Sequence, residues 1–195
     1  MKFFSAAYDR AMVWAVHRYA QWYLGALSFA EACVLPFPPP DVMLAPMSLA
    51  QPRRAWWFAT LTTVLSVLGG LAGYAIGHFA FDIVQPWIVQ IGYAEKYQTA
   101  VDWFEVWGIW VVLLAGFSPI PYKVFTIAAG VASMALLPFV FASLAGRGAR
   151  FFLVAGLMVL GGEKMDQVLR KYVDRLGWII VAAVVVVFGL VKLLA

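Results

Sequence analysis

The sequence Pro36-Phe37-Pro38-Pro39-Pro40-Asp41 interrupts an apolar segment that runs from residue 24 to residue 50. Each proline removes a backbone N–H donor and clashes with the preceding turn, so a continuous helix cannot pass through this cluster. A second apolar segment, 106–135, is interrupted in the same way by Pro119-Ile120-Pro121. Broken backbone survives within a membrane only where protein covers it or where it lines a wet cavity. We therefore predict two re-entrant helical hairpins, 24–50 and 106–135.

The composition is that of a membrane protein. Of the 195 residues, 64% are hydrophobic and 12% are charged, against roughly 45–50% and about 25% in soluble domains. A soluble globular fold is therefore excluded. A spanning helix needs about 20 apolar residues, and we predict full transmembrane spans at 55–81 and 138–160.

The two halves of the chain have the same order, a broken hairpin followed by a span. Setting Pro36 over Pro119 also sets Gly73 over Gly156. This order is typical of the internal repeats of transporters, and because one span separates the two hairpins, we predict that the repeats are inverted.

Three further segments complete the prediction, which is a single all-α integral membrane protein with its central membrane domain at 24–162. Residues 1–23 mix charged and aromatic side chains, which is typical of an N-terminal amphipathic helix at the membrane interface. Residues 82–105 are acidic and form a polar outer segment, in which Pro86 and Gly92 are expected to break helices.

Residues 163–195 are predicted to form a basic loop followed by a C-terminal transmembrane helix. The positive-inside rule places this loop in the cytoplasm together with Arg53 and Arg54.

Five ionisable side chains are expected inside the membrane, where such groups are costly and are functional candidates by default. They are Glu31, Asp41, Lys123, Arg147 and Arg150. Arginine suits bidentate contact with phosphate, so the three bases are predicted to bind an anionic headgroup. Burial favours the neutral form of a carboxyl group, so the two acids are predicted to exchange protons. The alternative is that these residues form buried ion pairs that only lock the hairpins together.

Other chemistry finds little support in the sequence. The single cysteine, Cys33, allows no internal disulfide and provides no metal-ligand spacing, and no combination of serine, histidine and acid suggests a nucleophile. We expect no enzyme, no cofactor and no metal. The net charge of +4 is not arranged as a nucleic-acid stripe and suits anionic lipid headgroups.

Three glycines, Gly69, Gly73 and Gly77, follow one another at four-residue spacing in the first span. Glycines so spaced form a flat helix face for close packing. This face permits a homodimer, and it equally permits packing within one chain.

These motifs together resemble the DedA family of bacterial inner-membrane proteins, within the VTT-domain or SNARE-associated Golgi protein superfamily. The resemblance covers residues 25–165 and rests on Glu31 and on the segments 36–41, 117–123 and 146–150. It is greatest with the smaller branch, which reads Pro-x-Pro-Tyr-Lys in the second hairpin.

The resemblance implies a multi-pass protein of the bacterial inner membrane that moves anionic lipids, either polyprenyl phosphate or phospholipid, and supports envelope homeostasis. Its essential acids would fall on Glu31 and Asp41, and its essential arginine on Arg150. Ser118 stands where many members have an arginine, so that charge would come from Lys123 or Arg147.

The leading hypothesis is thus a lipid flippase or scramblase. Two alternatives stay open. One is a structural or assembly protein of the membrane. The other is an enzyme acting on a lipid phosphate, with Asp41 or Glu31 as base or nucleophile.

Overall fold

The computed structural model describes residues 15–33, 39–90, 94–118 and 122–162, and these ranges are helical and contain no strand. The elements in chain order are α2 (Ala20–Cys33), α3 (Asp41–Ala50), the 3-10 helix η1 (Pro52–Arg54), α4 (Ala55–Gln90), α5 (Ala94–Phe117), α6 (Tyr122–Val131) and a last helix, Leu136–Gly162. The all-helical prediction is confirmed for this part of the chain.

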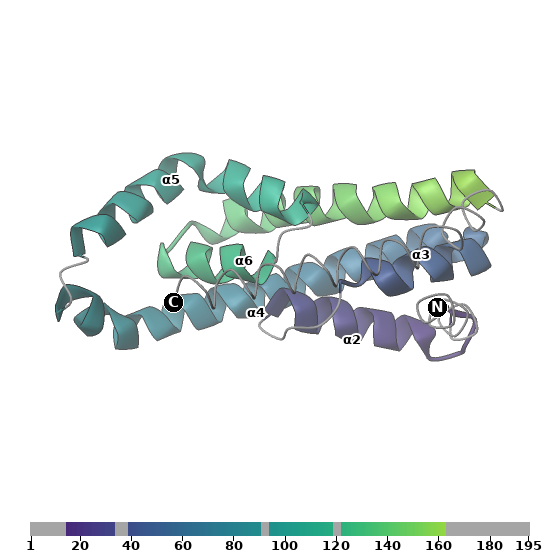
Figure 1. Ribbon diagram of the computed structural model, residues 1–195, viewed down its shortest axis with the longest axis horizontal. Coiled ribbons are helices and arrows are strands. Elements are labelled where there is room, and N and C mark those ends of the chain that lie inside the picture. Colours follow the sequence, from purple (N-terminus) through teal and green to yellow (C-terminus); the bar gives the residue numbers. More distant parts are fainter. Residues whose placement is uncertain (1–14, 34–38, 91–93, 119–121, 163–195) are drawn as a thin grey trace, which may run out of the picture.

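The other helices are arranged along the length of the long helix α4. Figure 1 shows α2 and α3 along one half of α4, α5 and α6 toward its other half, and the last helix running lengthwise beside them. The segment 15–51 ends close to where it begins. The Gln51 side chain, at the end of α3, donates to the Ala15 carbonyl at 2.9 Å. Arg54 likewise donates to the Gln21 side-chain oxygen at 3.1 Å. Pro36 and Pro119 both lie outside the residues that the structure describes.

Glycines let α4 approach its neighbours at backbone distance. A Cβ atom on Gly69 would lie 2.2 Å from the Phe29 carbonyl oxygen of α2, and one on Gly77 would lie 2.1 Å from the Ile127 carbonyl oxygen of α6. Gly73 lies between them, facing the Cys33 carbonyl and Thr126. The glycine face of α4 is therefore occupied by α2 and α6 of the same chain.

Each half of the molecule has its own apolar core. One cluster gathers α2, α3, the start of α4 and the end of the last helix, and the other gathers α5, α6 and the start of the last helix. The largest buried side chains of the two clusters include Leu24, Leu44, Phe58 and Phe151 in the first, and Val112, Tyr122 and Phe139 in the second.

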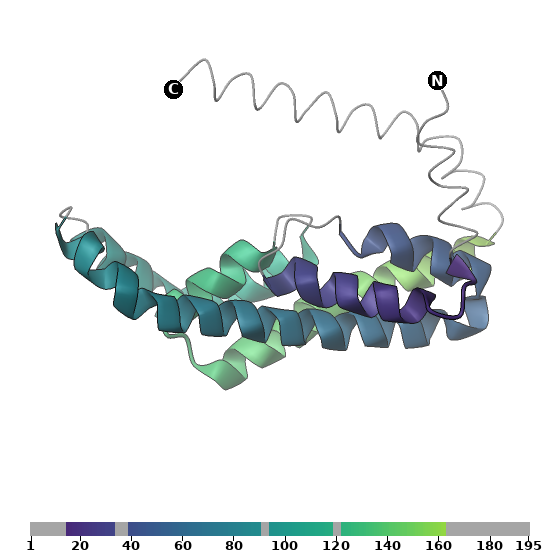
Figure 2. The same ribbon diagram turned by 90° about the horizontal axis from the view of Figure 1, so that it is seen from below.

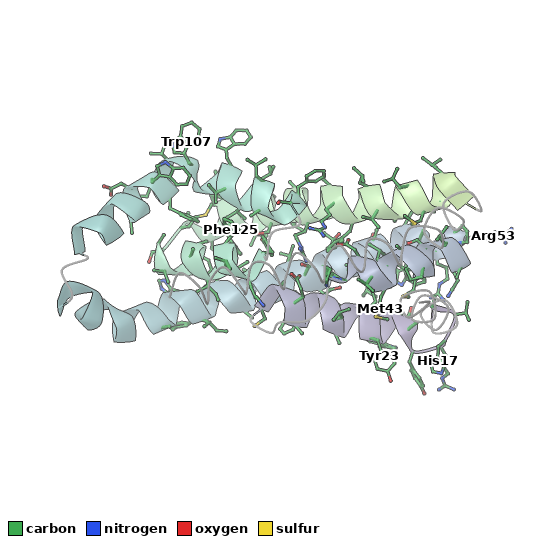
Figure 3. All side chains as sticks on the ribbon, viewed as in Figure 1. His17, Tyr23, Met43, Arg53, Trp107 and Phe125 are labelled. Carbon is green, nitrogen blue, oxygen red and sulfur yellow. The ribbon has the colours of Figure 1, made fainter. Side chains whose placement is uncertain are left out.

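The outer surface is suited to lipid. Among the described residues, Pro52–Ala80 and Leu136–Gly162 are long and apolar enough to cross a membrane. Exposed tryptophan and tyrosine side chains gather toward the two ends, as they do at membrane interfaces. They are Tyr19, Trp22, Tyr23, Trp56 and Trp57 on one side, and Trp103, Trp107 and Trp110 on the other. Figure 3 places Tyr23 and Trp107 toward opposite ends.

The structure differs from the sequence predictions at three places. An uninterrupted amphipathic helix up to Tyr23 is wrong, because residues 16–19 form a turn and α2 begins at Ala20. The reason is local, since the His17 ring nitrogen faces the Tyr19 N–H at 3.4 Å and so competes with helical hydrogen bonding. Residues 1–14 of that predicted helix, and the predicted segment 163–195, lie outside the described residues.

The other two differences lie in the segment 82–105. α4 continues through Pro86 to Gln90, so Pro86 does not end the helix, and Pro46 likewise lies inside α3. A proline in a helix can bend it instead of breaking it, and Figure 2 shows α4 curving toward its far end. The predicted polar segment 82–105 is consequently helical over most of its length, shared between α4 and α5. Gly92, the other expected breaker, lies outside the described residues.

Candidate functional site

The four charged residues of the site come from three helices and lie beside the two proline-rich breaks. Arg147 and Arg150 are three residues apart on the helix Leu136–Gly162, which places them on one face. Glu31 is in the last turn of α2, and Asp41 is the first residue of α3, so the two acids flank the break between these helices.

Arg147 is enclosed by its partners. Its Nη2 donates to Glu31 Oε2 at 2.7 Å, and its Nε donates to Ser66 Oγ of α4, also at 2.7 Å. The guanidinium lies over the rings of Tyr122 and Phe151, 5.0 and 4.7 Å from their centroids. The Arg147 side chain is only 2% exposed. Arg147 is thus a buried cation with a full set of partners.

Arg150 is held in a more open position. Its Nε donates to Asp41 Oδ2 at 3.1 Å, and its Nη2 donates to the same oxygen. Its Nη1 donates to the backbone carbonyl of Ser118, the residue that follows α5. The exposed fractions of the Arg150 and Asp41 side chains are 17% and 20%, so this ion pair is accessible where that of Arg147 is not.

The second oxygen of Asp41 is buried without a hydrogen-bond partner in the described part of the chain. Leaving such an acceptor unsatisfied costs about 1–3 kcal/mol. Arg150 and the N-terminal end of α3 stabilise the negative charge of Asp41, while the missing hydrogen bond to its second oxygen destabilises it. The Asp41–Arg150 pair is therefore less completely stabilised than the Glu31–Arg147 pair.

The structure brings four of the five predicted site residues together as two ion pairs, each joining an acid of the first half to a base of the second. Lys123, the fifth, is half-buried in the first turn of α6, next to Tyr122. Ser118, which replaces the expected arginine, takes part through its backbone carbonyl.

Two residues of this network had no predicted role. Ser66 binds Arg147 directly, and Tyr122 covers it while hydrogen-bonding to Ser143. Tyr122 is fully buried, away from the membrane interface at which tyrosines are commonly found. Its position between a proline break and Lys123 was the signal that could have singled it out.

An apolar cavity of about 410 Å³ lies between α5 and α6. Phe104 of α5 faces Val124 and Val131 of α6 across it, and every lining residue is hydrophobic. Its apolar walls suit a hydrocarbon chain. No group of three or more His, Cys, Asp or Glu side chains within the described ranges is placed to hold a metal ion.

Comparison with known proteins gives two kinds of similarity. The family described as VTT domain matches residues 33–160, which is more than half of the chain. An uncharacterized protein of Haemophilus influenzae is 50% identical over 192 residues, covering 98% of this chain and all of that protein. A second uncharacterized protein, from Histophilus somni, is 47% identical over 192 residues, again covering 98% of this chain and all of that protein. No solved structure matches the chain significantly.

Proposed function

The chain belongs to the VTT domain family, and from this premise we propose that it is a flippase or scramblase that moves anionic lipids across the bacterial inner membrane. The candidate substrates are polyprenyl phosphate and anionic phospholipid. Proteins of this family are membrane proteins, in agreement with the two long apolar helices. Envelope homeostasis is the cellular process that such transport supports.

The proposed architecture is a multi-pass fold of two inverted repeats, each a re-entrant hairpin followed by a span. The order of elements supports this architecture. Two short helices precede the long helix α4 in the first half, and α5 and α6 precede the last helix in the second half. In Figure 1 the pairs α2–α3 and α5–α6 lie toward opposite halves of α4. Two hairpins that enter from opposite faces meet near the middle of the bilayer, which is where transporters of this design bind substrate.

The observation that carries the proposal is the position of Arg150. It is bound by the first residue after one break, Asp41, and by the last described residue before the other, Ser118. Intramembrane ionisable groups at broken backbone mark substrate paths. A guanidinium in this position, partly accessible and held by one carboxylate, is suited to bind a phosphate in its place.

In the proposed cycle, a lipid phosphate displaces Asp41 from Arg150, and the displaced carboxylate takes up a proton. Proton uptake removes the cost of leaving a bare carboxylate near the membrane interior. Asp41 is the acid we assign to this step, because its second oxygen has no hydrogen-bond partner among the described residues. Glu31 contributes by keeping Arg147 charged and fixed, and a secondary role in proton exchange is proposed for it.

The other parts of the site follow from this cycle. Arg147 is proposed as a second arginine for the headgroup, and Lys123 at the start of α6 adds a further cation toward it. The apolar cavity between α5 and α6 offers a surface along which an acyl or prenyl tail stays in a hydrocarbon environment while its headgroup crosses.

Transport in proteoliposomes tests the proposal. Flux of fluorescent phospholipid and of polyprenyl phosphate is measured with and without a pH gradient, comparing the native chain with Arg150→Gln. Arg53→Gln is the matched control, because Arg53 is an exposed arginine of η1 outside the site. We expect Arg150→Gln to lose flux of at least one lipid, while Arg53→Gln keeps it. Equal flux in folded Arg150→Gln protein would refute the proposal.

The structural or assembly function is the second candidate, and the burial of Arg147 in its ion pair with Glu31 favours it. It predicts no flux of either lipid from the native chain, and a normal cell phenotype when both ion pairs are replaced by neutral residues of similar size. A lipid-phosphate enzyme ranks third and predicts turnover of a radiolabelled lipid phosphate.

A further inference from the structure

A second, separate cluster of polar residues lines a small cavity at the end of the bundle where α2 begins. The cavity has a volume of about 60 Å³ and lies between the turn 16–19, the start of α2, the end of α3 and η1. Its polar lining comes from His17, Arg18, Gln21, Gln51 and Arg54. One water molecule needs about 10–15 Å³ of such space, so the cavity has room for a small anionic group such as a phosphate.

The cavity is basic. Arg18 and Arg54 supply its charge, and no acidic residue is among the described residues that line it. Arg54 contacts neutral groups: it donates to Gln21 Oε1 at 3.1 Å and lies 5.5 Å from the centroid of the Phe58 ring. Arg18 donates to the Tyr19 hydroxyl at 2.5 Å. Within the described part of the chain, these guanidinium groups are thus oriented by neutral partners, and no acid balances their charge.

The helix that begins here adds to the positive potential. α2 has 14 residues and starts at Ala20, a lining residue, so the positive end of its dipole lies at the cavity. The floor is apolar, made by the buried side chains of Met47 and Phe58. A basic rim over an apolar floor is the arrangement that an anionic headgroup with attached hydrocarbon requires.

The position of the cavity relative to the membrane interface agrees with such a ligand. Exposed Tyr19, Trp22 and Trp57 surround this end of the molecule, and aromatic residues of this kind lie at headgroup level. Figure 3 shows His17 and Arg53 at this same end. The central ion pairs are formed by other residues, so the cavity is distinct from the proposed transport site.

We propose that this cavity is a binding site for the phosphate of an anionic phospholipid, which anchors the start of α2 and η1 to the leaflet on that side. Arg54 and Arg18 bind the phosphate oxygens, Gln21 and Gln51 are within the same lining for polar contact, and the acyl chains lie outside against the exposed aromatic residues. Binding here needs no lipid movement, so it can be measured independently of transport.

The experiment uses the full chain in nanodiscs of phosphatidylcholine that contain a minority of phosphatidylglycerol. Native mass spectrometry counts the phosphatidylglycerol molecules retained by the protein. Arg54→Gln is compared with Arg53→Gln, the neighbouring exposed arginine that does not line the cavity. We expect Arg54→Gln to weaken retention of one phosphatidylglycerol about tenfold, as loss of a charge-assisted contact implies, and Arg53→Gln to retain it.

Two further measurements make the result decisive. Arg18→Gln, a change in an exposed turn, is expected to weaken retention in the same direction even if Arg54→Gln does not fold. Titration of inorganic phosphate into discs of phosphatidylcholine alone is expected to show binding at least about tenfold weaker than the lipid, since free phosphate lacks the chains that hold it at the interface. Equal retention by Arg54→Gln, Arg18→Gln and Arg53→Gln overturns the proposal. Tight binding of inorganic phosphate without lipid retention overturns the assignment to a lipid.

Discussion

Arg150 directs two of its nitrogen donors to a single oxygen of Asp41, although 109 positions of sequence separate the two residues. The other Asp41 oxygen has no hydrogen-bond partner in the described part of the chain. A fork-to-fork pair would satisfy both oxygens, so this ion pair is held in an incomplete geometry. Incomplete pairing favours exchange of one anion for another at Arg150.

The fork of Arg150 is therefore expected to matter beyond its charge. Arg150→Lys keeps the charge but lacks the planar fork whose separate nitrogens bind Asp41 and the Ser118 carbonyl. We predict that lipid flux falls about tenfold or more in Arg150→Lys. Flux in proteoliposomes measures this, with circular dichroism and size-exclusion chromatography confirming the fold. Native flux in Arg150→Lys would mean that charge alone suffices.

Asp41→Asn separates proton coupling from lipid binding. The amide cannot take up a proton, and Arg150 no longer has an anionic partner to release. We predict that flux persists but no longer responds to a pH gradient. Glu31→Gln is the comparison, because it leaves Asp41 intact and is expected to keep the response. A gradient response that survives in Asp41→Asn would assign the proton to another group.

The Glu31–Arg147 pair is expected to act mainly on stability. Arg147→Met leaves Glu31 uncompensated in a largely enclosed position, which costs up to about 3–5 kcal/mol in free energy of unfolding. The double variant Glu31→Gln with Arg147→Met removes both charges, and we predict that it recovers most of this loss. Unfolding in detergent, followed by circular dichroism, measures the double-mutant cycle. Additive losses in the cycle would contradict the predicted coupling.

The close approach of α4 to α6 gives a test of the fold. Gly77→Ala places a Cβ atom 2.1 Å from the Ile127 carbonyl oxygen, and the forced separation is predicted to cost about 1–3 kcal/mol. Gly148→Ala on the last helix is the control, since its nearest neighbour is Thr63 Cγ2 at 3.6 Å. It is expected to be neutral or stabilising by up to about 1 kcal/mol. A Gly77→Ala protein as stable as the Gly148→Ala protein would argue against this packing.

Much of this arrangement follows from the sequence, because the strongest constraints in a membrane chain are local. Prolines, apolar runs and charges within apolar runs predicted the helical class, the long helices and the four residues of the two ion pairs. The order of elements in the two halves was also readable, since it depends only on where the breaks fall.

Other features depend on tertiary geometry that no local pattern encodes. Which acid meets which arginine is set by the rotation of the last helix against α2 and α3. Ser66 and Tyr122 belong to residue types that are common in membrane helices, and only their contact with Arg147 distinguishes them. The turn at 16–19 and the passage of α4 through Pro86 reflect hydrogen bonding and neighbouring packing, which outweigh propensity.

The order in which the ion-pair partners are synthesised sets a requirement on biosynthesis. Glu31 precedes Arg147 by 116 positions, so at roughly 5–20 residues per second the ribosome needs about 6–23 s to deliver the cation after the acid. During that interval Glu31 and Asp41 have no partner from the last helix, and a bare carboxylate in hydrocarbon is strongly disfavoured. The nascent first hairpin must wait either with its acids protonated or within the protein-lined environment of the insertion machinery. Insertion of the last helix then supplies Arg147 and Arg150, and the two acids form their ion pairs. This insertion is therefore the committing step of assembly.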